Sequence, residues 1–297
     1  MIELGPGAEL FRMLGGIFWL IFITAILGAA LIPKTKKGKT IAVAGVLGML
    51  LLFPGRQIVE KVQRENAART RLAEAEKRFQ EHCKTAGEFI QKTVENVDGI
   101  LVMKVRPEGQ NFGDQYKMDD PYGHDLPGDG YIGNFLRARN EKGHLTEAAG
   151  GYRYVDVIDP SDGKRYRYTG AVREVTRISS PLIGGDGKPF KTTAFVLDKI
   201  PSVDPQPRYG VTYDDISTHE DREYWIAGSS LRVIDLQTNV VIAERIGYMM
   251  DRGQGATGQG GSHPAWDRAR DHACPSNPAT DQTRNFVEKS LRPIQEN

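Results

Sequence analysis

The feature that most constrains this chain is a run of 20 residues without a charge. It covers residues 13–32 and reads MLGGIFWLIFITAILGAALI. A helix of this length rises about 30 Å, the thickness of the hydrocarbon core of a bilayer. The run is long for a cleavable signal peptide, and lysine-rich sequence follows it where a cleavage site would stand. We therefore expect a transmembrane helix over about 13–33.

A second uncharged run covers residues 40–55. It is short, and it spans a bilayer only if the helix continues past Arg56 with that side chain reaching the interface. The alternative is an interfacial segment. We favour a transmembrane hairpin with spans at about 13–33 and 40–57. The lysines between the runs place their loop inside and both termini outside. For a bacterial protein this corresponds to an inner-membrane location with a periplasmic C-terminal part, and the lipid bilayer is a partner.

The rest of the chain predicts a helical stalk followed by a folded domain. Residues 56–82 are rich in Ala, Glu, Arg and Leu and favour one charged helix. Phe89, Ile90, Val94 and Val97 have helical spacing and predict a further helix through about Asn96. Beyond it the apolar residues alternate, which is typical of strands. The predicted strands are 100–105, 152–158, 164–168, 172–178, 193–200, 209–213, 229–236 and 240–250, with a short helix over 284–292 and irregular structure over 106–150.

The fold class expected is therefore α+β. A membrane hairpin (1–55) and a stalk (56–82) precede a mainly antiparallel domain (83–297). Its only two cysteines, Cys83 and Cys274, exclude a disulfide-dense scaffold and a Cys₄ zinc site. A widely separated pair favours one disulfide that ties the ends of the domain together in an oxidising compartment. Two buried free thiols are the alternative.

Motifs for catalysis or cofactor binding are weak. Gly253, Gly255 and Gly258 match G-x-G-x-x-G, but no second parallel strand with an acidic residue follows, so a surface loop is the better interpretation. Three carboxylates fall within seven positions and are weak candidates for a calcium site whose order departs from an EF-hand. They are Asp119, Asp120 and Asp125.

Other polar clusters fit zinc or acid–base chemistry poorly. His263, His272 and Cys274 lack a fourth zinc ligand and a tight spacing. An acidic run reads more simply as a solvated loop, and it comprises Asp214, Asp215, His219, Glu220 and Asp221. We therefore predict a protein that is not an enzyme and has no catalytic residues and no cofactor. The balance of 39 basic and 38 acidic residues argues against a nucleic-acid partner.

Aromatic residues are the remaining clue to function. Tyr152, Tyr154, Tyr166 and Tyr168 alternate on neighbouring predicted strands. If they line one face, they are candidates for a protein interface, because tyrosine and arginine anchor such interfaces. An ordinary cross-strand ladder is the alternative.

Three stretches carry a resemblance to a known group of proteins. They are HCKTAGEFIQKTVENVDGI (82–100), MDDPYG (118–123) and EYWIAGSSLRVIDLQTNVVIAERIGYMMD (223–251). They resemble uncharacterised proteobacterial membrane-anchored or lipoprotein-like proteins, some of which are similar to immunity proteins encoded beside type VI secretion lipase effectors. The resemblance covers about half of the domain, implies no catalytic residue and fits Cys83 and Cys274 as a structural pair. The lipoprotein-like proteins of this group are anchored by a lipidated cysteine. This chain has two predicted membrane spans instead, and in this respect it departs from them.

These observations predict a membrane-anchored periplasmic binding protein, with a toxin that attacks the envelope as its protein partner. An envelope structural or assembly component is one alternative. An envelope enzyme that uses the acidic loops is the other.

Overall fold

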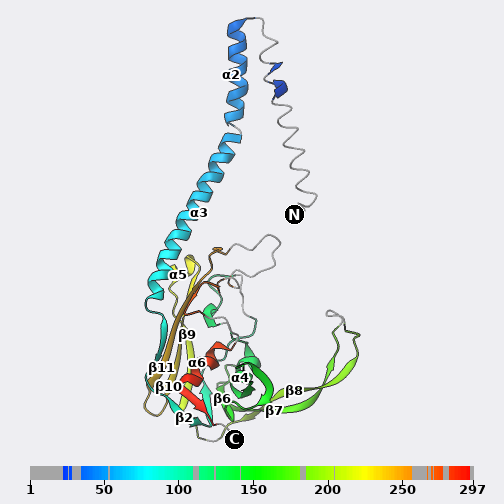
Figure 1. Cartoon of the computed structure of the whole chain (residues 1–297), viewed down its shortest axis with the longest axis vertical. Helices are drawn as coiled ribbons and strands as arrows, with labels where there is room; N and C mark the ends of the chain where they lie inside the picture. Colours follow the sequence, from blue (N-terminus) through cyan, green and yellow to red (C-terminus); the bar gives the residue numbers. More distant parts are fainter. Residues whose placement is uncertain are drawn as a thin grey trace. The chain divides into compact units, whose positions relative to one another are not determined.

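The computed structural model describes most of the chain from Lys36 onward (Figure 1). The described residues are 23–25, 27–28, 35–52, 54–109, 114–123, 125–140, 142–180, 185–203, 205–255, 266, 269, 271–276 and 281–294. The chain divides into two compact units, Met1–Thr70 and Arg71–Asn297.

The first unit contains helix α2 (Lys36–Leu52) and the start of helix α3 (Pro54–Cys83). The 17 residues of α2 rise about 26 Å, less than the thickness of a hydrocarbon core. Its first turn carries Lys36, Lys37 and Lys39, and α3 is charged from Arg56 onward. Among the described residues, no helix combines the length and apolar character needed to cross a bilayer.

This finding contradicts the predicted transmembrane hairpin. The second uncharged run lies mostly in α2, which is too short and too polar at its start. Most of the first predicted span, 13–33, lies outside the described residues. The bilayer as a partner and the inner-membrane location of a periplasmic domain rested on the two spans, and both predictions are wrong on the same evidence.

The second unit is built on a nine-stranded mixed sheet. Its strand order is β1-β11-β10-β9-β3-β6-β7-β8, and β12 pairs with β11. The strands are β1 (Gly87–Ile90), β3 (Gly99–Val102), β6 (Tyr154–Ile158), β7 (Arg165–Ile178), β8 (Pro189–Pro201), β9 (Tyr209–Asp215), β10 (Ile226–Asp235), β11 (Val240–Met250) and β12 (Ala273–Cys274). Two small sheets stand apart from it, formed by β2 (Val94–Val97) with β13 (Leu291–Pro293) and by β4 (Arg137–Arg139) with β5 (Leu145–Ala149).

The sheet is mixed because β3 lies parallel to both of its neighbours, β6 and β9, within an otherwise antiparallel sheet. All four residues of β3 are buried. Burial on both faces is characteristic of parallel strands, and it explains the continuous apolar run at this point of the sequence. The other pairings of the sheet are antiparallel.

The helix expected through Asn96 is absent from the structure, because residues 87–90 and 94–97 form β1 and β2 instead. β1 pairs with β11, and β2 pairs with β13. Phe89 and Ile90 remain exposed. Hydrogen bonding to strands that lie far away in the sequence has overridden the helical spacing of the apolar residues.

Helices cover both faces of the sheet. Helices α4 (Gly128–Leu136) and α6 (Gln282–Ser290) pack on one face, where Phe135 and Phe286 are fully buried with Val211 and Leu231. The end of α3 covers part of the other face, where Ala75 and Phe79 pack against residues of β10 and β11. The short helices η1 (Pro121–Gly123) and α5 (His219–Glu223) complete the unit (Figure 1).

Candidate functional site

The four tyrosines proposed as an interface do not share one face. Tyr152 is buried, and its hydroxyl donates to the Leu291 carbonyl at 2.5 Å. Tyr168 is buried in the main core, beside Tyr166 on the same face of β7. Tyr154 lies on the opposite face, with the Arg167 guanidinium 3.8 Å from its ring centre. Two of the four rings, those of Tyr152 and Tyr168, are therefore packing residues of the interior.

The candidate metal carboxylates are each engaged by a cation. Asp120 and Asp125 are buried and accept from Arg106 at 2.9 and 3.1 Å. Asp125 also accepts from the backbone and hydroxyl of Thr283, which ties this loop to α6. Asp119 pairs with Lys104 at 2.8 Å. In the described part of the chain, no group of three His, Cys, Asp or Glu residues is placed to hold a metal.

The acidic run before Tyr224 is structural as well. Thr218 and Asp221 form a capping box at the start of α5. Asp221 also accepts from Arg78 at 2.6 Å and contacts His82 at 2.9 Å. Although burial favours the neutral form, hydrogen bonds from Thr218, His82 and Arg78 lower the pKa of Asp221 to about 2. This cluster fastens α3 to α5.

Other residues of the same run, Asp214 and Asp215, pair with Arg232 and Arg222. His219 and Glu220 are exposed, and Glu220 pairs with Arg78. The run therefore contributes ion pairs at this end of the sheet.

Cys83 and Cys274 form a disulfide with a Cα–Cα distance of 5.6 Å. The bond joins the end of α3 to β12, and it removes Cys274 from the set of possible zinc ligands. His272 contacts Glu76 at 3.1 Å, and His263 lies outside the described residues.

The glycine-rich motif follows β11, which is antiparallel to β1, β10 and β12 and so lacks the parallel neighbour of a dinucleotide site. Gly253 and Gly255 donate their backbone N–H groups to Asp251 in a turn. Gly258 lies outside the described residues.

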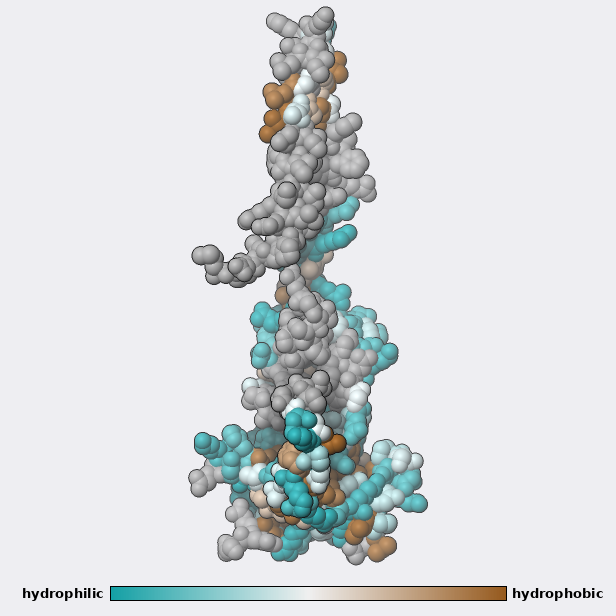
Figure 2. Space-filling view, turned by 90° about the vertical axis from the view of Figure 1, so that its right-hand side faces the viewer, coloured by the Kyte–Doolittle hydropathy of each residue, from teal (hydrophilic) through white to brown (hydrophobic). Residues whose placement is uncertain are grey.

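A different feature dominates the surface of the second unit. Strands β7 and β8 run on beyond β6 as a curved two-stranded ribbon (Figure 1). We call residues 172–178 and 189–195 of this ribbon the arm. Ile178 is 72% exposed, and Val172 and Phe190 are 47% and 48% exposed. Figure 2, which looks onto this side of the molecule, shows apolar residues among hydrophilic ones at the surface.

The base of the ribbon, in contrast, is well packed. The Phe195 ring lies over Gly170, where an added Cβ would meet the ring at 2.0 Å. Arg137 of β4 lies 5.4 Å from the centre of the same ring, and Glu147 of β5 accepts from the Phe195 backbone N–H at 2.8 Å. The ribbon therefore projects from a rigid base.

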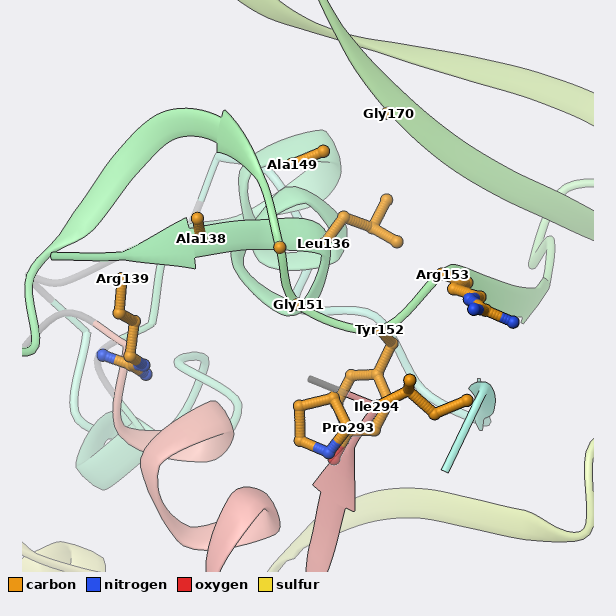
Figure 3. Close-up of a pocket in the computed structure, with 11 residues that line it drawn as sticks. Leu136, Ala138, Arg139, Ala149, Gly151, Tyr152, Arg153, Gly170, Pro293 and Ile294 are labelled. Carbon is orange, nitrogen blue, oxygen red and sulfur yellow. The ribbon is translucent and has the colours of Figure 1, made fainter. Parts of the chain in front are cut away.

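A pocket of about 660 Å³ opens beside the base of the arm. It lies between the β4–β5 hairpin, β7 and the end of β13 (Figure 3). Gly170 lines it, and small residues form much of the remaining wall. Arg139 and Arg153 lie on opposite sides, with Tyr152, Pro293 and Ile294 along one wall.

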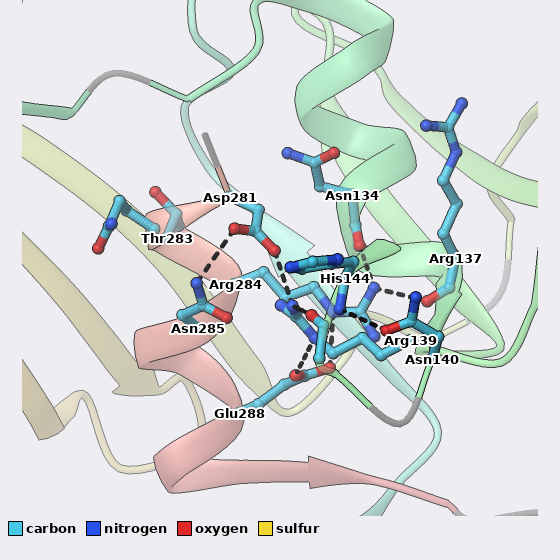
Figure 4. Close-up of polar contacts among 12 residues, drawn as sticks. Asn134, Arg137, Arg139, Asn140, His144, Asp281, Thr283, Arg284, Asn285 and Glu288 are labelled. Carbon is cyan, nitrogen blue, oxygen red and sulfur yellow. Dashed lines mark hydrogen bonds and ion pairs between the residues drawn. The ribbon is translucent and has the colours of Figure 1, made fainter. Parts of the chain in front are cut away.

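An arginine network supports this pocket from behind (Figure 4). Buried Arg284 of α6 donates to the carbonyl oxygens of Asn134 and Arg137 and to Glu288. Arg139 donates to Asp281 at 2.7 Å and to Glu288 at 3.2 Å. Burial lowers the pKa of Arg284, whereas Glu288 raises it. These bonds hold the β4–β5 hairpin against α6 and fix the wall of the pocket.

Comparison with family models, with curated proteins and with solved structures finds no match to this chain. The argument for function therefore depends on the geometry of the arm and its pocket.

Alternation over 172–178 predicts a strand, but it does not reveal that this strand extends past the end of the neighbouring strand β6. The signal that could have indicated this is the length of β7, 14 residues, opposite the five residues of β6.

Proposed function

We propose that this chain is a protein-binding protein and that the arm is its main contact element. The observation that carries the proposal is a two-stranded ribbon whose outer part exposes apolar side chains on both faces. Ile178 lies on one face, and Phe190 lies on the other.

Physical chemistry favours a partner for such a ribbon. An isolated two-stranded hairpin is marginally stable in water and gains stability when a third strand or a packing surface is added. The pairs Arg173–Asp198 and Lys191–Glu174 link the two strands, but all four side chains are exposed. Exposed ion pairs contribute about 0–1 kcal/mol each. Contact with another protein would bury the apolar residues that the fold leaves in solvent.

The class of partner comes from the resemblance to immunity proteins. On that basis we propose a toxic effector as the partner, neutralised by binding. Neutralisation needs a tight complex that covers the functional surface of the toxin, and a projecting arm is a suitable element for this. The toxin itself is recognised through complementarity with the arm.

Photo-crosslinking in the cell tests the proposal. The photoreactive amino acid p-benzoylphenylalanine replaces Ile178 or Phe190 in the full-length chain. Val240, which is 50% exposed on β11, is the matched control for Phe190. We expect adducts of one mass from both arm positions and none of that mass from position 240. The crosslinked protein is then purified and mixed with the chain.

The expected result is a complex with a fixed ratio of the two proteins, and rescue of growth when the chain is co-expressed with that protein. A complex without rescue retains the binding function and refutes the toxin. Equal adducts at all three positions, or none, would refute the arm as the contact element.

A further inference from the structure

We infer that the partner binds by adding an extended strand to the free edge of β7, in the place where β6 would continue. This inference rests on the proposed function and specifies how the arm binds. The pairing of β6 with β7 ends at Val155 and Tyr168. β7 continues to Ile178 with β8 on one side only. The slot on its other side is therefore open for the length of the arm.

The register shows which backbone groups face this slot. The Phe195 N–H points away from β7, because it donates to Glu147. Phe195 is opposite Val172, so the backbone groups of Val172 also point away from β8. Because the direction of the backbone N–H and C=O groups alternates along a strand, the groups of Glu174 and Thr176 point away from β8 as well. In the described part of the chain, no hydrogen-bond acceptor is found for the N–H groups of these three residues.

The two edges of the arm differ. On β8, prolines stand at both ends of the strand, and Glu147 occupies the outward N–H of Phe195. Prolines and covering side chains are devices that prevent strand addition. The edge of β7 has no proline between Arg165 and Ile178, and no side chain of the described residues covers it in this way. Strand addition is therefore favoured at β7.

The charges on β7 indicate the chemistry of the added strand. Arg173 and Arg177 lie four residues apart on the same face of β7. Arg173 pairs with Asp198, whereas Arg177 has no acidic partner within ion-pair distance among the described residues. A strand antiparallel to β7 would place acidic side chains opposite these arginines.

At the other end of the slot, Gly170 lines the pocket of about 660 Å³. The partner segment is therefore extended, acidic at positions i and i+4, and bulky and apolar near its C-terminal end.

A synthetic peptide tests this directly. Glu-Val-Thr-Val-Glu-Val-Thr-Phe, labelled with fluorescein, places its glutamates opposite Arg177 and Arg173 and its phenylalanine opposite Gly170. The control peptide has lysine in place of both glutamates. Fluorescence anisotropy with the full-length chain measures binding. We expect the glutamate peptide to bind at least about tenfold more tightly, and equal affinity would overturn the charge assignment.

Matched proline variants locate the edge. Thr176→Pro removes an N–H that faces the slot, and Thr193→Pro removes one on the outer edge of β8. Neither N–H takes part in the β7–β8 ladder, so circular dichroism should show the same fold for both variants. We expect Thr176→Pro to weaken binding at least about tenfold and Thr193→Pro to change it less than about twofold. Equal losses, or a loss with Thr193→Pro alone, would overturn the inference.

Hydrogen exchange gives a readout that needs no variant. Binding of the glutamate peptide should slow amide exchange at Val172, Glu174 and Thr176 but leave Thr193 unchanged. Unchanged exchange at all four amides would refute strand addition.

The oligomeric state of the chain tests the identity of the partner. If the chain forms a dimer that Thr176→Pro dissociates, a second copy fills the slot, and the assignment to a different protein is overturned.

The two proposals fail separately. If crosslinking from the arm identifies a partner whose binding Thr176→Pro leaves unchanged, the edge inference is wrong and the binding function stands. If no partner crosslinks, the proposed function fails whatever the peptide does.

Discussion

Replacing Phe79 by alanine should destabilise the second unit strongly, although the sequence places this residue in a charged helix. Phe79 is only 5% exposed. Its ring lies in the cluster formed by Ala75, Ile226, Tyr248 and Met250, and its centre is 4.8 Å from that of His272. Deleting the ring therefore removes the main apolar contact between α3 and the sheet.

The magnitude follows from the buried area. The change removes about 150 Å² of aromatic surface from the interior, and at about 25 cal/mol per Å² this corresponds to about 4 kcal/mol. That value lies within the usual range of about 3–5 kcal/mol for replacement of a buried phenylalanine by alanine. With a urea m-value of about 2.5 kcal/mol per M, the unfolding midpoint should fall by about 1.6 M.

Urea unfolding of the full-length chain, followed by tryptophan fluorescence without reductant, measures the change. Val62→Ala is the matched control, since Val62 lies on the same helix but is 48% exposed. Its expected cost is below about 0.5 kcal/mol. Similar small shifts for both variants would show that the end of α3 is not part of the core, and they would refute the packing argument.

Two further predictions concern buried charges. Arg106→Met leaves Asp120 and Asp125 buried without their cation and should lower the free energy of unfolding by about 3–5 kcal/mol. Arg292→Met breaks a pair with Glu95 in which both side chains are exposed, and it should cost less than about 1 kcal/mol. Equal costs in urea unfolding would contradict the role given to Arg106. The pKa of Asp221 is about 2 in the folded chain against an ordinary value of 3.8, so its contribution to stability is present above about pH 4 and is lost as the pH falls toward 2. Thermal unfolding of Asp221→Asn should therefore show a lower melting temperature at pH 7 and a smaller further loss between pH 4 and 2 than the parent chain, and an unchanged acid profile would argue against this assignment.

Much of the sheet follows from local pattern. Alternating residues predict β6, β9, β10 and β11 within a few residues of their observed bounds, because a half-buried strand exposes every second side chain. The helix predicted over 284–292 corresponds to α6 (Gln282–Ser290). In contrast, α4 falls in a stretch expected to be irregular. It contains three glycines, which disfavour a helix, and packing of Tyr131, Ile132 and Phe135 against the sheet overrides that preference.

The candidate site was less accessible from sequence than the strands. The structure buries Tyr152 and Tyr168 and pairs the three candidate carboxylates with cations, and a residue type by itself does not reveal such neighbours. The pocket is assembled from α4, β4, β5, β7 and β13, so its residues are scattered between positions 136 and 294. No local motif can mark such a site.

The sequence by itself determined where most strands lie, since side-chain alternation is a local property of the backbone. It also determined that the chain holds a single pair of cysteines, separated by 191 positions. Only the tertiary structure decided that β3 is parallel to its neighbours, that the last turns of α3 belong to the core and that β7 extends beyond β6. Each of these depends on hydrogen bonds or apolar contacts between segments distant in the chain, and such contacts leave no periodic signal in either segment alone.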